Sequence, residues 1–131
     1  MNHALEFHDS HVESMVESGK TLRIILTAYV HRSDGRPGVD AGAGYTQPVE
    51  LVFAPVAAGS LSLQHSGALC DGTLIANGQS MSLVPLPYSA AGHISLSLSF
   101  TSGATFSATA TSVSCAATGE AQFVEHYAAA G

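Results

Sequence analysis

The sequence has few charged residues and very few basic ones. Charged side chains make up 11% of the 131 residues, with four lysines and arginines against ten aspartates and glutamates, so the formal net charge is −6. A protein that binds nucleic acid needs a basic surface to neutralise phosphates, and this chain has no such surplus. Nucleic acid is therefore excluded from the expected partners.

Long apolar runs and a secretory leader are also missing. No apolar stretch approaches the ~20 residues that a membrane-spanning helix needs. The N-terminal stretch "MNHALEFHDSHVESM" has neither the basic nor the apolar region of a signal peptide. We expect a cytoplasmic protein that does not enter a membrane.

Tryptophan is absent, and the two cysteines, Cys70 and Cys115, form no CxxC or other metal-binding spacing. Each lies in a strand-like stretch, where a free cysteine usually behaves as a small buried hydrophobic residue. A disulfide and a reactive thiol are the alternatives. The apolar fraction of 46% lets one domain of this length bury a core without disulfide or metal support. We expect no cofactor.

What the sequence has in abundance is the alternation of apolar residues with serine or threonine. Apolar residues occupy every second position from Ile94 to Phe100 and again from Phe106 to Ala110. This period of two, interrupted by a turn signal at Ser102–Gly103, predicts an antiparallel hairpin over residues 94–111. The phase of the alternation changes near Ser112, which predicts a β-bulge.

Short strands and turn signals recur along the rest of the chain. The turn signals are Ser18-Gly19-Lys20, Asp71-Gly72 and Asn77-Gly78. The remaining predicted strands are Leu5–Phe7, Val12–Val16, Thr21–His31, Val49–Phe53, Leu61–Gln64, Met81–Val84 and Ala121–His126. The pattern predicts a single all-β domain over residues 1–131, an antiparallel β-sandwich or flattened small barrel of about eight to ten short strands.

The serine and threonine face of the 94–111 hairpin carries no charge. An uncharged strand at the edge of a sheet invites association unless something covers it. We expect this face to contact a second subunit, which makes a homodimer the expected oligomer. A solvated face is the alternative.

The stretch "YVHRSDGRPGVDAGAGY" (29–45) gathers charge in a chain that otherwise has little. In one interpretation an arginine of this loop binds a carboxylate or phosphate group of a ligand, and a neighbouring aspartate orients it. In the other, the same charges pair with one another and fix the loop, or dock it on a second subunit. The candidate binding residues are His31, Arg32, Asp34, Arg36 and Asp40.

The second candidate segment is "HDSH", which comprises His8, Asp9, Ser10 and His11. Adjacent residues of a strand point to opposite faces, so these letters cannot converge as a catalytic triad. In a turn, Asp9 or Ser10 would instead hydrogen-bond the backbone. A metal held by Asp9, His11 and a distant histidine such as His31, His93 or His126 is a further possibility, but the spacing matches no metal motif and we assign no metal site.

Two segments, "LEFHDSHVES" (5–14) and "AYVHRSDGRPGVDAGAGY" (28–45), resemble small bacterial proteins of a family without assigned function. The resemblance implies a compact all-β protein. It implies no activity and therefore no catalytic residue.

Three functions follow from these observations as hypotheses. The first is a non-catalytic binding or protein-interaction module, in which the 31–45 loop and the "HDSH" segment (8–11) form one polar surface. The second is a small hydrolase or isomerase, with or without a metal, that uses Asp9, His11, His31 and Asp34. It requires a hollow that brings at least two of these groups within hydrogen-bond reach. The third is a structural subunit of a larger assembly.

Overall fold

The computed structural model describes residues 1–57 and 66–128, and within them the chain is all-β. All pairings between its strands are antiparallel, and the described residues contain no helix. The predicted all-β class is thus confirmed. The strands are β1 (Asn2–Ser18), β2 (Thr21–Ser33), β3 (Gly42–Phe53), β4 (Gly67–Ala76), β5 (Gln79–Met81), β6 (Leu83–Pro85), β7 (Tyr88–Phe100), β8 (Thr105–Ala117) and β9 (Gln122–Tyr127).

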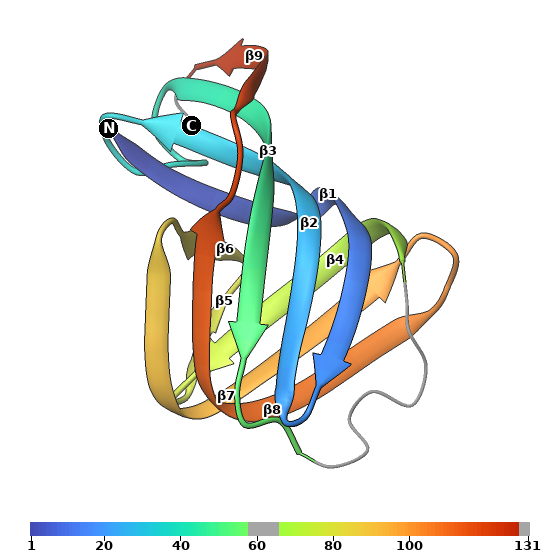
Figure 1. The fold of residues 1–131 in the computed structure, drawn as a ribbon. Coiled ribbons are helices and arrows are strands. Elements are labelled where there is room, and N and C mark those ends of the chain that lie inside the picture. The colour runs from blue at the N-terminus through green and yellow to red at the C-terminus, as the bar shows by residue number, and fades with distance from the viewer. Residues whose placement is uncertain (58–65, 129–131) are drawn as a thin grey trace.

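Six of these strands close into a barrel. The order is β4-β7-β8-β3-β2-β1, and β1 pairs with β4 to complete the ring at His11–Ala68 and Val12–Gly67. Figure 1 shows the six strands wrapped around a common interior. Every second side chain points inward, and the inward set forms one apolar core whose most deeply buried large members include Phe7, Phe53, Met15, Leu22, Ile24, Leu51, Leu74 and Leu96.

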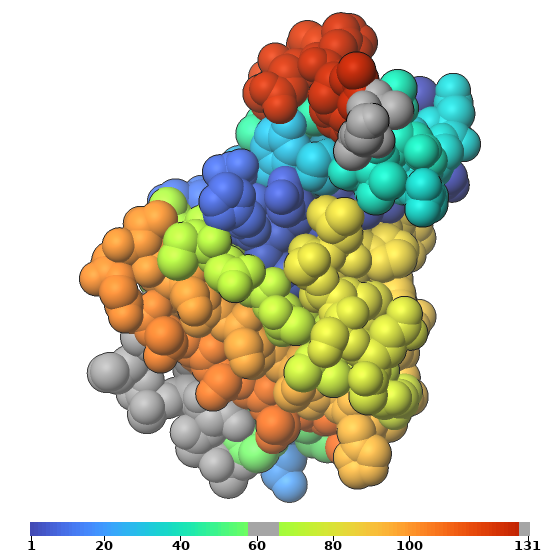
Figure 2. Space-filling view, turned by 180° about the vertical axis from the view of Figure 1, so that it is seen from behind, coloured from blue at the N-terminus to red at the C-terminus, as the bar shows by residue number. Residues whose placement is uncertain are grey.

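Strands β1, β2 and β3 are longer than the barrel and continue beyond it as a second, projecting sheet. In this sheet β6 pairs with residues 4–6 of β1, and β9 pairs with residues 42–46 of β3. Figure 1 shows β9 and the ends of β2 and β3 above the barrel, and Figure 2 shows the same part in red and cyan standing above the body of the molecule. We call the face that continues the barrel interior the inner face, and the opposite one the outer face.

The hairpin predicted over residues 94–111 is confirmed as β7 and β8. The change of phase near Ser112 coincides with an irregular register, but the extra residue lies in β7. Ala91 pairs with Ser112 and Ile94 pairs with Ala110, so three residue steps in β7 lie opposite two residue steps in β8. Strand β7 is paired on both sides, with β4 and β8, whereas β8 pairs with β3 only through residues 113–117. The subunit contact expected at this hairpin stays a prediction.

The predicted turn at Asp71–Gly72 is wrong. Both residues lie inside β4, beside a shift in the β4–β7 pairing register between Leu69 and Asp71. A Cβ on Gly72 would lie 2.7 Å from Cβ and Cγ of Phe7. The glycine is therefore needed for the close approach of β1 to β4, and a sequence signal for a turn cannot be told from a signal for close packing.

The turns at Gly19, at Asn77–Gly78 and at Gly103 are confirmed, and each of these residues has a positive φ. The two predicted strands 5–7 and 12–16 belong to one strand, β1, which bulges between them. The stretch 81–84 is divided between β5 and β6, and the predicted strand 61–64 lies outside the described residues.

The two thiols are both free, but they differ in environment. Cys115 is buried in the core, as predicted, whereas Cys70 is exposed, contrary to the prediction. Cys70 stands at the irregularity of β4, where alternation no longer fixes which face a side chain takes.

No helix of the described residues is long and apolar enough to cross a membrane.

Candidate functional site

The loop between β2 and β3 is fixed by its own groups. The carboxylate of Asp40 accepts a hydrogen bond from the backbone N–H of Arg36 at 2.6 Å and lies 3.5 Å from its Nε. The hydroxyl of Ser33 donates to the carbonyl of Ala41 and accepts from the N–H of Gly35. The pairing of Arg36 with Asp40 is thus the self-bracing alternative predicted for this loop, and the Arg36 hydrogen bonds hold the pKa of Asp40 below its usual value.

The other charged candidates of this segment do not form one site. Asp34 is exposed, and its side chain makes no hydrogen bond or ion pair with the described residues. His31 and Arg32 are neighbours in β2 and so point to opposite faces of the projecting sheet. The predicted group is therefore divided between two surfaces.

On the outer face, His31 is held from both sides. Its Nε2 lies 2.8 Å from Oε2 of Glu6, and its Nδ1 lies 3.1 Å from the phenol of Tyr127 in β9. Because a carboxylate can only accept, Nε2 carries a proton, and in the neutral ring Nδ1 accepts from the phenol. Both nitrogens of His31 are thus engaged, and the side chain is only 13% exposed.

A second side-chain hydrogen bond also joins β2 to β9. The phenol of Tyr29 donates to Oε1 of Glu125 in β9 at 2.9 Å. Burial, and then this carboxylate, raise the pKa of Tyr29, while burial and the charges of Glu6 and Glu125 raise the pKa of Tyr127. Both phenols therefore stay protonated and act as hydrogen-bonding groups between β2 and β9.

A glycine makes room for this arrangement. A Cβ on Gly44 of β3 would lie 1.9 Å from the phenol oxygen of Tyr29, whose ring crosses β3 at that position. Gly44 is buried although it lies on the outer face, because the tyrosine covers it. The glycines of the stretch 41–45 thus serve the packing of β2 on β3.

The "HDSH" segment forms the bulge of β1, where residues 7–10 have no partner in β2. Asp9 has a positive φ of 69°. The hydroxyl of Ser10, which is 2% exposed, donates to the carbonyl of Glu6 and accepts from the N–H of Tyr29. The prediction that a turn here would use Ser10 to hydrogen-bond the backbone is confirmed.

The remaining residues of that segment make local pairs at the surface. His8 lies 3.3 Å from Asp9, and His11 lies 3.0 Å from Glu13. Within the described residues, no hydrogen bond or ion pair joins any two of the four groups that the hydrolase or isomerase hypothesis needs, which are Asp9, His11, His31 and Asp34. The described part of the chain also contains no group of three histidine, cysteine or acidic side chains placed to hold a metal.

A small hollow of about 280 Å³ joins the two predicted segments on the outer face. His8 comes to it from the "HDSH" segment, and His31 and Gly38 come from the loop. Its other lining residues are Glu6, Asp71, Gly72, Ser82 and Leu83. The two predicted segments thus converge at this small hollow, to which His8 and His31 are the candidate residues that contribute.

The inner face carries a continuous row of rings next to Arg32. The Arg32 guanidinium carbon lies 4.3 Å from the centre of the Tyr45 ring, and the rings of Tyr45 and Phe123 meet edge to face at 5.7 Å. His126 packs on Phe123 at 4.7 Å, and His3 lies directly opposite Arg32 in β1. We call His3, Arg32, Tyr45, Phe123 and His126 the Arg32 row.

The Arg32 row reaches solvent, because Phe123 and His126 are exposed and its other members are half-buried, whereas the inner face closer to the barrel is buried. Val30, one step closer to the barrel on β2, is fully buried, whereas Phe123 is 54% exposed and its neighbour Val124 is 46% exposed. The pairing of β9 with β3 is what brings Phe123 and His126 into the row. Sequence reasoning proposed Arg32 but missed the aromatic members, because their position depends on a strand pairing between residues almost 80 apart.

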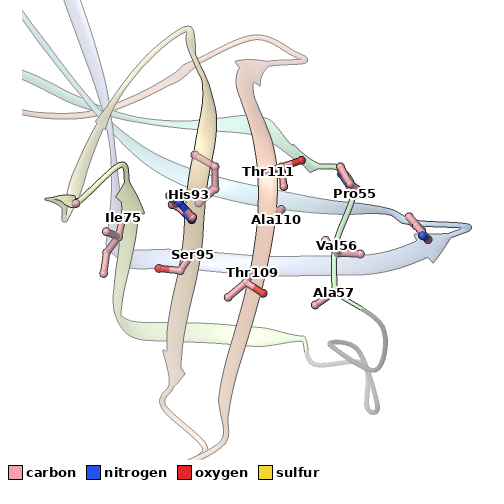
Figure 3. A pocket seen from close by; sticks show the side chains of 12 residues that line it. Pro55, Val56, Ala57, Ile75, His93, Ser95, Thr109, Ala110 and Thr111 are labelled. Carbon is pink, nitrogen blue, oxygen red and sulfur yellow. The ribbon is translucent and has the colours of Figure 1, made fainter.

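A larger hollow, of about 580 Å³, lies at the other end of the barrel. Figure 3 shows Ser95, Thr109 and Thr111 on β7 and β8 beside Ile75, Val56 and Ala57. Its ionisable members within the described residues are Lys20 and His93, and no acidic side chain lines it. The serine and threonine face of the hairpin thus borders an open depression without paired catalytic groups.

No protein-family model, curated protein or solved structure matches this chain.

Proposed function

We propose that the chain is a non-catalytic protein-interaction module and that its docking surface is the inner face of the projecting sheet. The loop of residues 31–45 contributes Arg32 and Tyr45 to this surface and fixes the two strands that carry them. The single observation that carries the proposal is the exposed Arg32 row. In it the Arg32 guanidinium and the rings of Tyr45, Phe123 and His126 contact one another in series, with His3 opposite Arg32, on a sheet face that is otherwise buried.

The composition of the row fits protein recognition. Aromatic residues and arginine are enriched where protein partners meet. An aromatic side chain offers a large rigid contact area with few rotatable bonds, and a guanidinium offers several hydrogen-bond donors in one plane. Exposed neighbouring apolar groups such as Phe123 and Val124 stand outside the closed barrel, so covering them requires no rearrangement of the core.

Catalysis has weaker support from the geometry. His31 is the best candidate base, but both of its ring nitrogens already have partners. The raised pKa values of Tyr29 and Tyr127 oppose a phenolate nucleophile or base. A hydrolase or isomerase at this place would first have to break the bonds that hold β9.

The test is photo-crosslinking from the proposed surface. Phe123 is replaced by p-benzoylphenylalanine, and in a control protein the same residue replaces Val16, which is 50% exposed on the barrel part of β1. We expect a discrete adduct with one partner from position 123 and none from position 16. Equal labelling from both positions, or no adduct from position 123, would overturn the proposal.

The mass of the adduct also distinguishes the possible partners. An adduct of twice the chain mass would identify a second copy, in agreement with the homodimer expected from the sequence. An adduct with a different protein would identify a heterologous partner and favour the structural-subunit hypothesis as its setting. The cytoplasmic location stays a prediction from the sequence.

A further inference from the structure

Arg32 differs from the other arginines in having no acidic partner. Arg23 lies 3.4 Å from Glu50, and Arg36 lies 3.5 Å from Asp40. No carboxylate of the described residues lies within ion-pair distance of Arg32, although the chain has ten acidic residues and only four basic ones. In a chain with so many carboxylates, the one unpaired guanidinium lies on the exposed aromatic face.

The guanidinium is also fixed in place. Its Nε is buried without a hydrogen-bond partner among the described residues, and its central carbon lies over the ring of Tyr45. The two terminal nitrogens make no hydrogen bond to the described residues and are not among the buried atoms, so they remain open to solvent. A guanidinium held on an aromatic ring loses little further freedom when it binds a carboxylate through two parallel hydrogen bonds.

We propose that Arg32 binds an aspartate or glutamate side chain of the docked protein, and that an apolar residue beside this acid packs on Tyr45 and Phe123. The inference rests on the proposed function and adds the chemistry that the surface recognises. A phosphate backbone is a poorer occupant, because one cation in a chain of net charge −6 cannot hold a run of phosphates.

His3 provides a reporter within the site. It lies opposite Arg32 across the β1–β2 pair. Burial lowers the pKa of His3, and the positive charges of Arg32 and of the chain amino terminus lower it further. A carboxylate bound at Arg32 offsets part of that positive charge, so it should raise the pKa of His3 toward its usual value.

The experiment uses two blocked peptides, acetyl-Thr-Phe-Glu-Val-Thr-amide and the same peptide with glutamine in place of glutamate. Blocked ends leave the glutamate side chain as the only carboxylate. Each peptide is titrated into the full chain while NMR follows the backbone amides and the ring of His3. We expect the glutamate peptide to bind about tenfold more tightly than the glutamine peptide and to raise the pKa of His3.

Two arginine variants form a matched pair. Arg32→Gln should abolish the preference for glutamate, whereas Arg36→Gln, which removes a paired arginine of the same segment, should retain it. If the spectrum shows that Arg32→Gln does not fold, Arg32→Lys replaces it and should keep the charge but lose most of the preference. Retention of the full preference in either Arg32 variant would overturn the inference.

The outcomes separate this inference from the proposed function. Equal binding of the two peptides, or no binding of either, would overturn recognition of an acidic side chain, whatever the photo-crosslink shows. A response of His3 to free acetate as large as the response to the glutamate peptide would identify a site for small anions instead and would also overturn it. Loss of the crosslink from position 123 concerns the docking surface itself.

Discussion

Replacing Gly72 by alanine should destabilise the protein, although the change adds only one methyl group. The new Cβ would lie 2.7 Å from Cβ and Cγ of Phe7 and 3.0 Å from Cδ2 of Leu98. Phe7 is 1% exposed, and its Cβ is bonded directly to the backbone of β1, so it cannot swing aside as the end of a long side chain would. The two strands would have to separate at this point.

Two opposing effects set the magnitude. Overpacking of a core costs about 1–3 kcal/mol, whereas the loss of glycine's freedom in the unfolded chain stabilises by about 0.4–1 kcal/mol. We expect the free energy of unfolding to fall by about 1–2 kcal/mol. With a urea m value of about 2 kcal/mol/M, the unfolding midpoint should fall by about 0.5–1 M, with m unchanged.

The assay is urea unfolding of the wild type, of Gly72→Ala, of Phe7→Ala and of the double variant. Phe7→Ala keeps the Cβ contact but removes the Cγ contact and the ring, so the added methyl should cost less in that background, with a coupling of about 0.5 kcal/mol. A Gly72→Ala variant more stable than the wild type would refute the reasoning, because only the unfolded-chain effect would then remain.

Three further results are expected. Tyr127→Phe removes a hydrogen bond worth about 1 kcal/mol, so amide exchange in β9 should accelerate about fivefold while β7 and β8 are unaffected; equal acceleration throughout would contradict the local role of that bond. The raised pKa values of Tyr29 and Tyr127 mean that the folded state holds their protons more tightly, so this contribution to stability is complete below pH about 10 and declines above it. The urea midpoint of Tyr29→Phe should therefore fall less than that of the wild type as the pH rises above about 10. An equal or larger fall of the midpoint in the variant would contradict the argument. Cys70 should react with a thiol reagent in the folded protein, whereas burial, which raises the pKa of Cys115 to about 12, should protect that thiol until the chain unfolds; two fast thiols per chain would be inconsistent.

The alternation of side chains predicted the strands well but not their arrangement. The period of two from Ile94 to Ala110 depends only on which face is buried, and both faces exist whether a sheet is open or closed. Closure depends on the pairing of β1 with β4, which no local pattern encodes. The same limit explains Gly72, since a glycine required by a neighbouring strand looks the same in the sequence as one required by a turn.

The candidate site was predicted in part for a similar reason. The charges of the 31–45 segment marked an unusual stretch, and the pairing of Arg36 with Asp40 follows from their spacing in a tight loop. The bonds of His31 involve β1 and β9, and the ring contact of Arg32 involves β3, so their partners depend on the three-dimensional pairing of strands. Neighbouring residues of a strand point to opposite faces, and this general property places His31 and Arg32 on different surfaces.

Closure of the barrel at His11–Ala68 and Val12–Gly67 has a mechanical consequence. This junction is the shortest between neighbouring barrel strands within the described residues, so fewer residue pairs hold the barrel closed there than at any other strand pair of the ring. Beside this junction, Phe7 of β1 packs against Gly72 of β4, so side-chain packing as well as backbone pairing holds the two strands together. Strand β1 forms this junction near its middle and belongs to the projecting sheet at its start. A force applied to the projecting sheet is therefore transmitted to the β1–β4 junction along one continuous strand.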